Sequence, residues 1–195
     1  MKFLDRFIRN RRIAQVIRVI PRNVRVFDIG CHDGHLFDLL GSSLEKGIGI
    51  DPFLTNEVTK PAFRLLPGSF PDDVPGDVGE FDIVCALAVL EHVRADELSS
   101  FVNRMASLLA GGGAVVLTVP SPRVDAILDL LIKLRLLDGM EPDQHHGFQI
   151  GDIVPLFVAA GLSLERHTHF QFGLNNLFLF RKPVVTNSTS SPKST

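Results

Sequence analysis

The sequence contains no tryptophan, no tyrosine and only two cysteines, and it has no long uninterrupted hydrophobic run. Cys31 and Cys85 both end strand-like runs, which argues against a disulfide framework and favours reduced, half-buried thiols. No apolar stretch approaches the roughly 18 residues that a membrane-spanning helix needs, and the N-terminus lacks the apolar core and cleavage site of a signal peptide. We therefore expect a cytoplasmic protein.

The composition that remains is that of a globular α/β domain. Hydrophobic residues make up 45% and charged residues 22% of the 195 positions, which indicates neither wholesale disorder nor a membrane protein. The length fits one domain whose sheet is buried on both faces. We divide the chain into an N-terminal basic amphipathic helix (1–22), the main domain (23–183) and a polar tail (184–195) that we expect to be disordered.

The net charge of −2 hides a strongly basic N-terminal segment. Residues 1–25 contain eight lysine and arginine residues against one aspartate, so this segment is +7 and the remainder is −9. A basic amphipathic helix can bind an anionic partner, either a membrane surface or nucleic acid. Its apolar residues also keep helical spacing, which favours a helix packed over one edge of the sheet.

Alternating apolar runs and helical patterns predict seven strands in a mostly parallel sheet with right-handed crossovers. The strands are expected at 24–29, 47–50, 63–66, 81–87, 114–119, 162–170 and 176–182. A short turn joins the last two strands, which predicts that they are antiparallel to each other. Helices are expected at 96–109, 124–137 and 150–160, and the glycine triplet at 111–113 is expected to terminate the first of them.

The most informative segment is 24–51, with the sequence VRVFDIGCHDGHLFDLLGSSLEKGIGID. Its first apolar run ends in Asp28 and a turn, where Gly30 and Gly34 allow a ligand to approach the backbone closely. Asp51 ends the next apolar run, and a carboxylate at that place can accept hydrogen bonds from both hydroxyls of a ribose. The segment therefore predicts a βαβ unit that binds a nucleoside.

Two histidines distinguish this turn from better-known nucleotide sites. His32 and His35 break the GxGxxG pattern of dinucleotide sites, and no phosphate-loop lysine follows, so the turn indicates a mononucleoside site. His32 also stands where such a turn usually has glycine, so a left-handed backbone there would be strained. Three interpretations stay open: its ring contacts the ligand, caps the following helix, or blocks the pocket.

Three further segments and the closing pair of strands follow this turn in an order that resembles the class I S-adenosylmethionine-dependent methyltransferases. The segments VFDIGCHDG, LLPGSFPDDVP, FDIVCALAVLEHV and GGGAVVLTVPSP precede the closing pair of strands, and the resemblance covers roughly residues 20–182. It implies a Rossmann-like, doubly wound α/β fold with a seven-stranded, mostly parallel sheet whose last strand is antiparallel. It also implies S-adenosylmethionine as the cofactor, with S-adenosylhomocysteine as the product.

The resemblance also implies which residues bind the cofactor. The implied positions are Asp28, Gly30, Cys31, His32 and Gly34 under the methionine part, Asp51 at the ribose, Pro52, Ser69 and Phe70 at the adenine, and Ala86 and Leu87 at the methionine end. The acid that the family usually has after its third strand is absent here, and Ser69 takes its place.

The cofactor carries its own activation, so the protein mainly has to hold a nucleophile in line with the methyl group and exclude water. No metal and no covalent intermediate are needed. A base helps only when the acceptor must lose a proton, and histidine suits that role near neutral pH. The candidates are His145 and His146 in the expected loop at 138–149, and His92 after the fourth strand, for which a structural role at a helix start is favoured.

The expected acceptor is a small molecule. An apolar cover at 122–149 and the basic N-terminal helix favour a hydrophobic or membrane-derived acceptor, with a peripheral membrane contact through that helix. Phenylalanine supplies all 15 aromatic residues and is interleaved with basic residues only at the N-terminus, so nucleic acid is not expected. Methylation at nitrogen, oxygen or carbon stays open, as do a homodimer through 124–137 and the alternative of a non-catalytic, methyltransferase-like binding or scaffold protein with weakened cofactor affinity.

Overall fold

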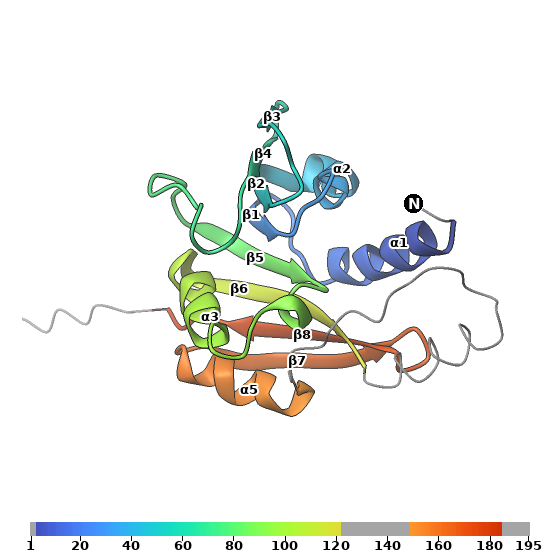
Figure 1. The fold of residues 1–195 in the computed structure, drawn as a ribbon, viewed down its shortest axis with the longest axis vertical. Coiled ribbons are helices and arrows are strands. Elements are labelled where there is room, and N and C mark those ends of the chain that lie inside the picture. Colours follow the sequence, from blue (N-terminus) through green and yellow to red (C-terminus); the bar gives the residue numbers. More distant parts are fainter. Residues whose placement is uncertain (1–2, 122–148, 185–195) are drawn as a thin grey trace, which may run out of the picture.

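The fold is built on one mixed sheet with the strand order β3-β4-β2-β1-β5-β6-β8-β7 (Figure 1). The computed structural model describes residues 3–121 and 149–184. Its strands are β1 (Val24–Ile29), β2 (Leu44–Asp51), β3 (Val58–Thr59), β4 (Phe63–Pro67), β5 (Phe81–Leu87), β6 (Leu109–Pro120), β7 (Ser163–Phe170) and β8 (Asn175–Arg181). The five strands from β4 to β6 are parallel, whereas β8 runs antiparallel to both of its neighbours.

This topology confirms the predicted mostly parallel sheet with an antiparallel last strand, and it adds the two-residue strand β3. The chain winds outward from β1 in both directions, with β2 on one side and β5 on the other. Where the strand order reverses in this way, the carboxyl ends of the strands leave a crevice that ligands can enter. The turn after β1 opens into this crevice.

Helices cover both faces of the sheet because successive strand residues point to opposite sides. They are α1 (Phe3–Ile17), α2 (His35–Leu40), α3 (Leu98–Ser107) and α5 (Ile150–Ala159), with short 3₁₀ turns η1 (Gly41–Ser43) and η2 (Leu90–His92). In β1, Phe27 belongs to the apolar cluster that contains α3 and α5, and Val26 belongs to the cluster that contains α1 and α2. The structure is thus doubly wound.

The predicted role of the glycine triplet at 111–113 was wrong. Helix α3 already ends at Ser107, and β6 begins at Leu109, where it pairs with Phe81. The pairing register shifts before Ala114, so the triplet lies within β6 at an irregularity of the strand. Gly112 has a φ of 79°, a conformation that glycine adopts without strain.

Helix α1 packs onto the sheet through Ile13 and Val16, which lie in the same cluster as Val116 and Leu179. Ala14, an apolar residue between them, is exposed. Among the residues described, no helix is long and apolar enough to cross a membrane. The predicted helix at 124–137 lies outside the described residues, as do nearly all of the expected loop and tail.

Candidate active site

The turn after β1 has the backbone conformation that its glycines predict. Gly30 and Gly34 have φ values of 73° and 75°, and His32 between them has a φ of 49°. A Cβ on Gly30 would lie 2.8 Å from Cγ2 of Val89, so this position accepts only glycine without movement of its neighbours. A left-handed non-glycine residue costs about 1–3 kcal/mol, so the surrounding structure must hold His32 in place.

Asp51 supplies that restraint from the end of β2. The backbone N–H of His32 donates to Oδ2 of Asp51 at 2.8 Å, and the N–H of Phe53 donates to Oδ1 at 2.9 Å. Asp51 is buried at 5% exposure, and its carboxylate joins the two turns that follow β1 and β2. Each carboxylate oxygen has a second lone pair, so the group can still accept hydrogen bonds from the two hydroxyls of a ribose.

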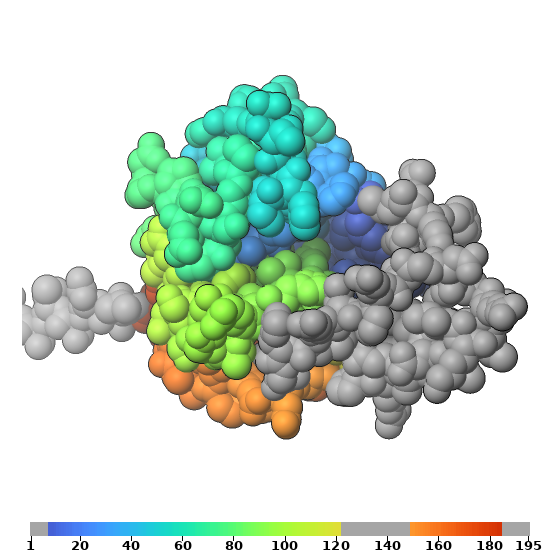
Figure 2. All heavy atoms as spheres, viewed as in Figure 1, coloured from blue at the N-terminus to red at the C-terminus, as the bar shows by residue number. Residues whose placement is uncertain are grey.

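A cavity of about 180 Å³ opens beside these turns. Gly30, Ile50, Pro52, Ser69, Phe70, Val89, His92 and Phe101 are among its lining residues. In the space-filling view, the surface is hollowed between the cyan segments around β2 to β4 and the green segments that follow β5 (Figure 2). The lining is mainly apolar with few polar groups, which suits a flat heterocycle attached to a sugar.

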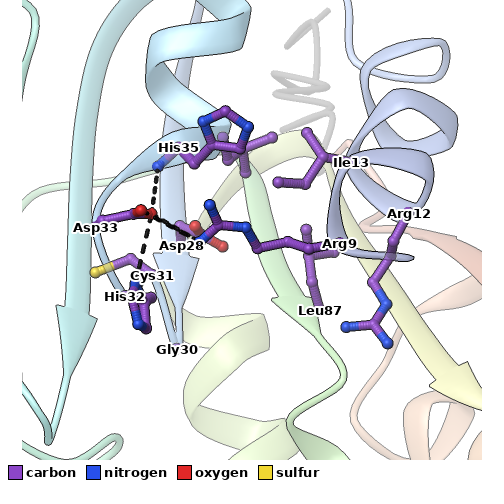
Figure 3. Close-up of a pocket in the computed structure, with 11 residues that line it drawn as sticks. Arg9, Arg12, Ile13, Asp28, Gly30, Cys31, His32, Asp33, His35 and Leu87 are labelled. Atoms are coloured by element: carbon purple, nitrogen blue, oxygen red, sulfur yellow. Dashed lines mark hydrogen bonds and ion pairs between the residues drawn. The ribbon is translucent and has the colours of Figure 1, made fainter. Parts of the chain in front are cut away.

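A second, smaller cavity of about 90 Å³ lies on the other side of Gly30. Its walls come from the turn after β1, from the end of β5, and from α1 (Figure 3). Asp28, Cys31, His32 and Leu87 line it as the sequence had suggested, and so do Arg9, Arg12, Ile13, His35 and Leu36, which were not expected there. Because Gly30 borders both cavities, a ligand that passes over this residue would occupy both.

Asp28 is the electrostatically unusual group of the smaller cavity. Burial raises the pKa of its carboxyl group to about 8, and the negative charge of Asp51 adds to the shift. Among the described residues, no side chain donates a hydrogen bond to this carboxyl group. A buried acid without a donor is suited to receive a cationic group from a ligand. Burial likewise raises the pKa of the neighbouring Cys31 thiol, which is therefore an unreactive, protonated wall of the cavity.

An ion pair connects α1 to the turn after β1. Nη1 of Arg9 donates to both oxygens of Asp33, at 3.1 and 3.2 Å, and the N–H of His35 donates to Oδ1 of Asp33 at 3.3 Å. Partial burial works against ionisation of Asp33, but the charge and hydrogen bonds of Arg9 lower the pKa of this carboxyl group. Figure 3 shows Arg9 reaching across from α1 to Asp33. The pair keeps the helix against the outer side of the smaller cavity.

The remaining predicted residues fall into four groups. Gly34 is the N-cap of α2, and the carboxylate of Asp33 accepts the N–H of His35, the first residue of this helix, at 3.3 Å. The ring of His32 lies beside Asp33, with Nδ1 at 3.5 Å from Oδ1, so Asp33 takes the capping role that the sequence had left open for His32. Ala86 is fully buried in β5 and lines neither cavity. His92 ends η2 and lines the larger cavity, on the nucleoside side. His145 and His146 lie outside the described residues.

The sequence interpretation missed the contribution of α1. Arg9 lies four residues before the buried Ile13 and three before Arg12, so it is a neighbour of both on the helix surface. Basic residues inside an otherwise apolar stripe were a usable signal. The sequence interpretation assigned all basic side chains of the segment to the exposed face of the helix, so it missed that two of its arginines line a cavity.

Comparison with known proteins identifies the family of this chain. A family profile described as a methyltransferase domain matches residues 2–170. The chain belongs to this family. It is an S-adenosylmethionine-dependent methyltransferase domain, as the resemblance of its motifs had implied, and its cofactor is S-adenosylmethionine.

A tRNA U34 carboxymethyltransferase from Alcanivorax borkumensis is 29% identical in an alignment of 104 residues that covers 49% of this chain. The match spans only 32% of the length of that protein.

Two solved structures share the fold of the methyltransferase domain. The N-methyltransferase NodS from Bradyrhizobium japonicum WM9 has a TM-score of 0.65 and 14% identity, over 90% of this chain and 96% of its own. Magnesium protoporphyrin IX methyltransferase (ChlM) from Synechocystis PCC 6803 with bound SAH has a TM-score of 0.64 and 18% identity, over 93% and 88%.

Proposed function

We propose that this methyltransferase transfers the methyl group of S-adenosylmethionine to a small acceptor with an apolar surface. The observation that carries the proposal is the position of α1 over the smaller cavity, where Ile13 joins Leu36 and Leu87 as apolar lining. The ion pair between Arg9 and Asp33 holds the helix there. Asp28, on another side of this cavity, faces the amino-acid end of the cofactor, so the acceptor approaches along the apolar side, which favours an acceptor that is partly apolar.

The inward arginines also argue against nucleic acid as the acceptor. A nucleic-acid site needs several basic side chains on an exposed surface that can follow phosphates. In the described part of α1, Arg9 and Arg12 instead line the smaller cavity, and Arg9 is already paired with Asp33. Two of the arginines of the basic segment are therefore taken from its exposed surface, where Arg11 and Arg18 remain. The tRNA-modifying relative matches over too small a share of its own length to carry its acceptor over to this chain.

The two cavities fit the parts of the cofactor in order. In this arrangement the adenine lies in the larger cavity, which Phe70 and Pro52 line. Asp51, which precedes Pro52 and lines neither cavity, accepts the ribose hydroxyls with the free lone pairs of its carboxylate. Beyond Gly30, the carboxyl group of Asp28 faces the place where the amino group of the methionine end would lie. An ammonium there would favour ionised Asp28 and lower the pKa that burial raises.

The chain's own residues then have to position the acceptor and exclude water. The cofactor supplies an activated methyl group on a sulfonium when bound. Leu87, Ile13 and the backbone around Gly30 shape a small, water-poor volume in which an acceptor atom can be held close to that group. His145 and His146 are the proposed bases for an acceptor that must lose a proton, since His92 lines the nucleoside side.

Binding of the cofactor is the first test. A ligand present at a hundred times its dissociation constant stabilises a protein by about 2.7 kcal/mol, so thermal unfolding with S-adenosylhomocysteine should show a clear shift. Asp51→Ala should remove the shift, and Asp152→Ala, at an exposed position on α5, should keep it. No shift for the wild type at millimolar ligand would favour the non-catalytic alternative instead.

The acceptor class is tested by methyl transfer from labelled S-adenosylmethionine. Cell extracts would be separated into small apolar metabolites, small polar metabolites, lipids and total tRNA before the reaction. We expect label in the small apolar fraction. Label in the tRNA fraction alone would overturn the proposed acceptor class while leaving the methyltransferase assignment intact.

A further inference from the structure

The turn between β7 and β8 carries the most exposed large apolar side chain of the described residues. Phe172 is 101% exposed, and its backbone is left-handed, with a φ of 59°. Gln171 before it is also left-handed, with a φ of 52°. Left-handed non-glycine residues are unfavourable and persist only where the surrounding structure holds them. One exposed apolar residue is common, but one that a strained turn holds outward points to a binding role.

The side chain of Gln171 fastens this turn to α1. Its Nε2 donates to the backbone carbonyl of Ile8 at 3.4 Å, and its Oε1 accepts a hydrogen bond from Nδ2 of Asn175 at 2.6 Å. Ile8 is itself 37% exposed, so α1 and the turn present apolar side chains on two elements that touch. Figure 1 shows α1 and the turn at the same side of the sheet. The turn therefore holds Phe172 outward from a fixed position beside the helix.

The exposed side of the N-terminal segment is cationic. Arg11 and Arg18 are exposed on and just after α1, and Arg22 is exposed a few residues later. No acidic residue occurs in positions 6–27, so the positive charge there is not balanced along the chain. An anionic membrane surface matches both features, since its headgroups attract cations and its interface accepts apolar side chains.

We propose that α1 and the β7–β8 turn form a docking surface for an anionic membrane, with Phe172 inserted among the lipids and the exposed arginines at the headgroups. The turn precedes Asn175, which pairs with Pro120 at the carboxyl end of β6. The crevice with the two cavities opens at the same edge of the sheet, because β1, β5 and β6 are parallel. A docked membrane would therefore lie beside the edge where the acceptor enters. Docking itself does not depend on the proposed acceptor.

Co-sedimentation with vesicles tests the docking surface on the full chain. The vesicles contain phosphatidylcholine alone or phosphatidylcholine mixed with phosphatidylglycerol, which is anionic. Each cation near an anionic surface contributes about fivefold in affinity, so the wild type should bind the anionic vesicles roughly 100-fold more tightly than the neutral ones. Phe172→Ser should weaken binding to the anionic vesicles about 10-fold, because it removes the inserted side chain. Arg18→Gln should weaken it about fivefold.

Matched variants separate the position of a side chain from its chemistry. Phe172→Leu keeps an apolar side chain and should retain vesicle affinity within about threefold. Val158→Ser on α5 and Lys46→Gln on β2 each remove an exposed side chain of the same kind elsewhere, and both should bind vesicles like the wild type. All of these variants should keep the thermal shift with S-adenosylhomocysteine, so a failure of docking is distinguishable from a failure of the proposed function.

Three results would overturn the inference. The wild type would fail to sediment with the anionic vesicles, or Phe172→Ser would bind them as tightly as the wild type. The third is binding of total tRNA in place of vesicles, weakened by Arg18→Gln and unaffected by Phe172→Ser, which would assign the exposed arginines to nucleic acid.

Discussion

Replacing Asp28 with asparagine should stabilise the protein while weakening its binding of the cofactor. The carboxyl group has a pKa of about 8 in the folded chain against 3.8 for an ordinary aspartate, with burial as the main cause. At pH 7 Asp28 is therefore protonated in the folded state and ionised in the unfolded state. Each pH unit above the ordinary pKa lowers the free energy of unfolding by about 1.4 kcal/mol, so over roughly three units up to pH 7 the cost is about 4 kcal/mol. Asparagine resembles the protonated acid and avoids this cost.

The sign of the pH dependence follows from the same shift. Between pH 4 and pH 8 the folded state holds a proton on Asp28 that the unfolded state has lost, so the stability of the wild type falls as the pH rises. Urea unfolding of the wild type and Asp28→Asn at pH 5, 7 and 8.5 measures this. We expect the stability difference between them to be about 1–2 kcal/mol at pH 5 and to grow by about 2–3 kcal/mol by pH 7. A difference that does not change with pH would refute the reasoning.

Three further substitutions test the turn and its restraints. His32→Gly should keep cofactor affinity within about threefold in calorimetry, because the bond to Asp51 comes from the backbone N–H and the His32 side chain is 58% exposed. Gly30→Ala should destabilise the fold by about 1–3 kcal/mol in urea unfolding and weaken binding, since its Cβ would meet Val89. Asp51→Asn should cost about 1–3 kcal/mol in the same assay, because its amide would face a backbone N–H.

The sheet could be predicted because strand patterns and buried strands are local properties of the sequence. The bounds of β1 and β5 match the predicted ranges 24–29 and 81–87, since continuous apolar runs of six or seven residues bounded by turns leave little choice. The glycine triplet was wrongly predicted to end a helix, because the conformation of this segment depends on a neighbouring strand. Phe81 of β5 pairs with Leu109, so β6 begins directly after α3 and already contains the triplet. No local pattern contains that pairing.

The candidate site also has one part that the sequence predicts and one part that only the folded chain shows. Asp51 and the glycine turn follow from spacing along one βαβ unit, whereas the smaller cavity is closed by α1, which precedes that unit and packs against it only in the folded chain. Charge on a helix is normally a property of its exposed face, so the sequence alone assigned the N-terminal arginines to an external partner. The burial of Arg12 and the pairing of Arg9 with Asp33 reverse that assignment for these two residues. An inward arginine must be matched by an anion, and Asp33 and Glu91 supply this negative charge from segments that meet α1 only in the folded chain, so no pattern along the helix itself could show it.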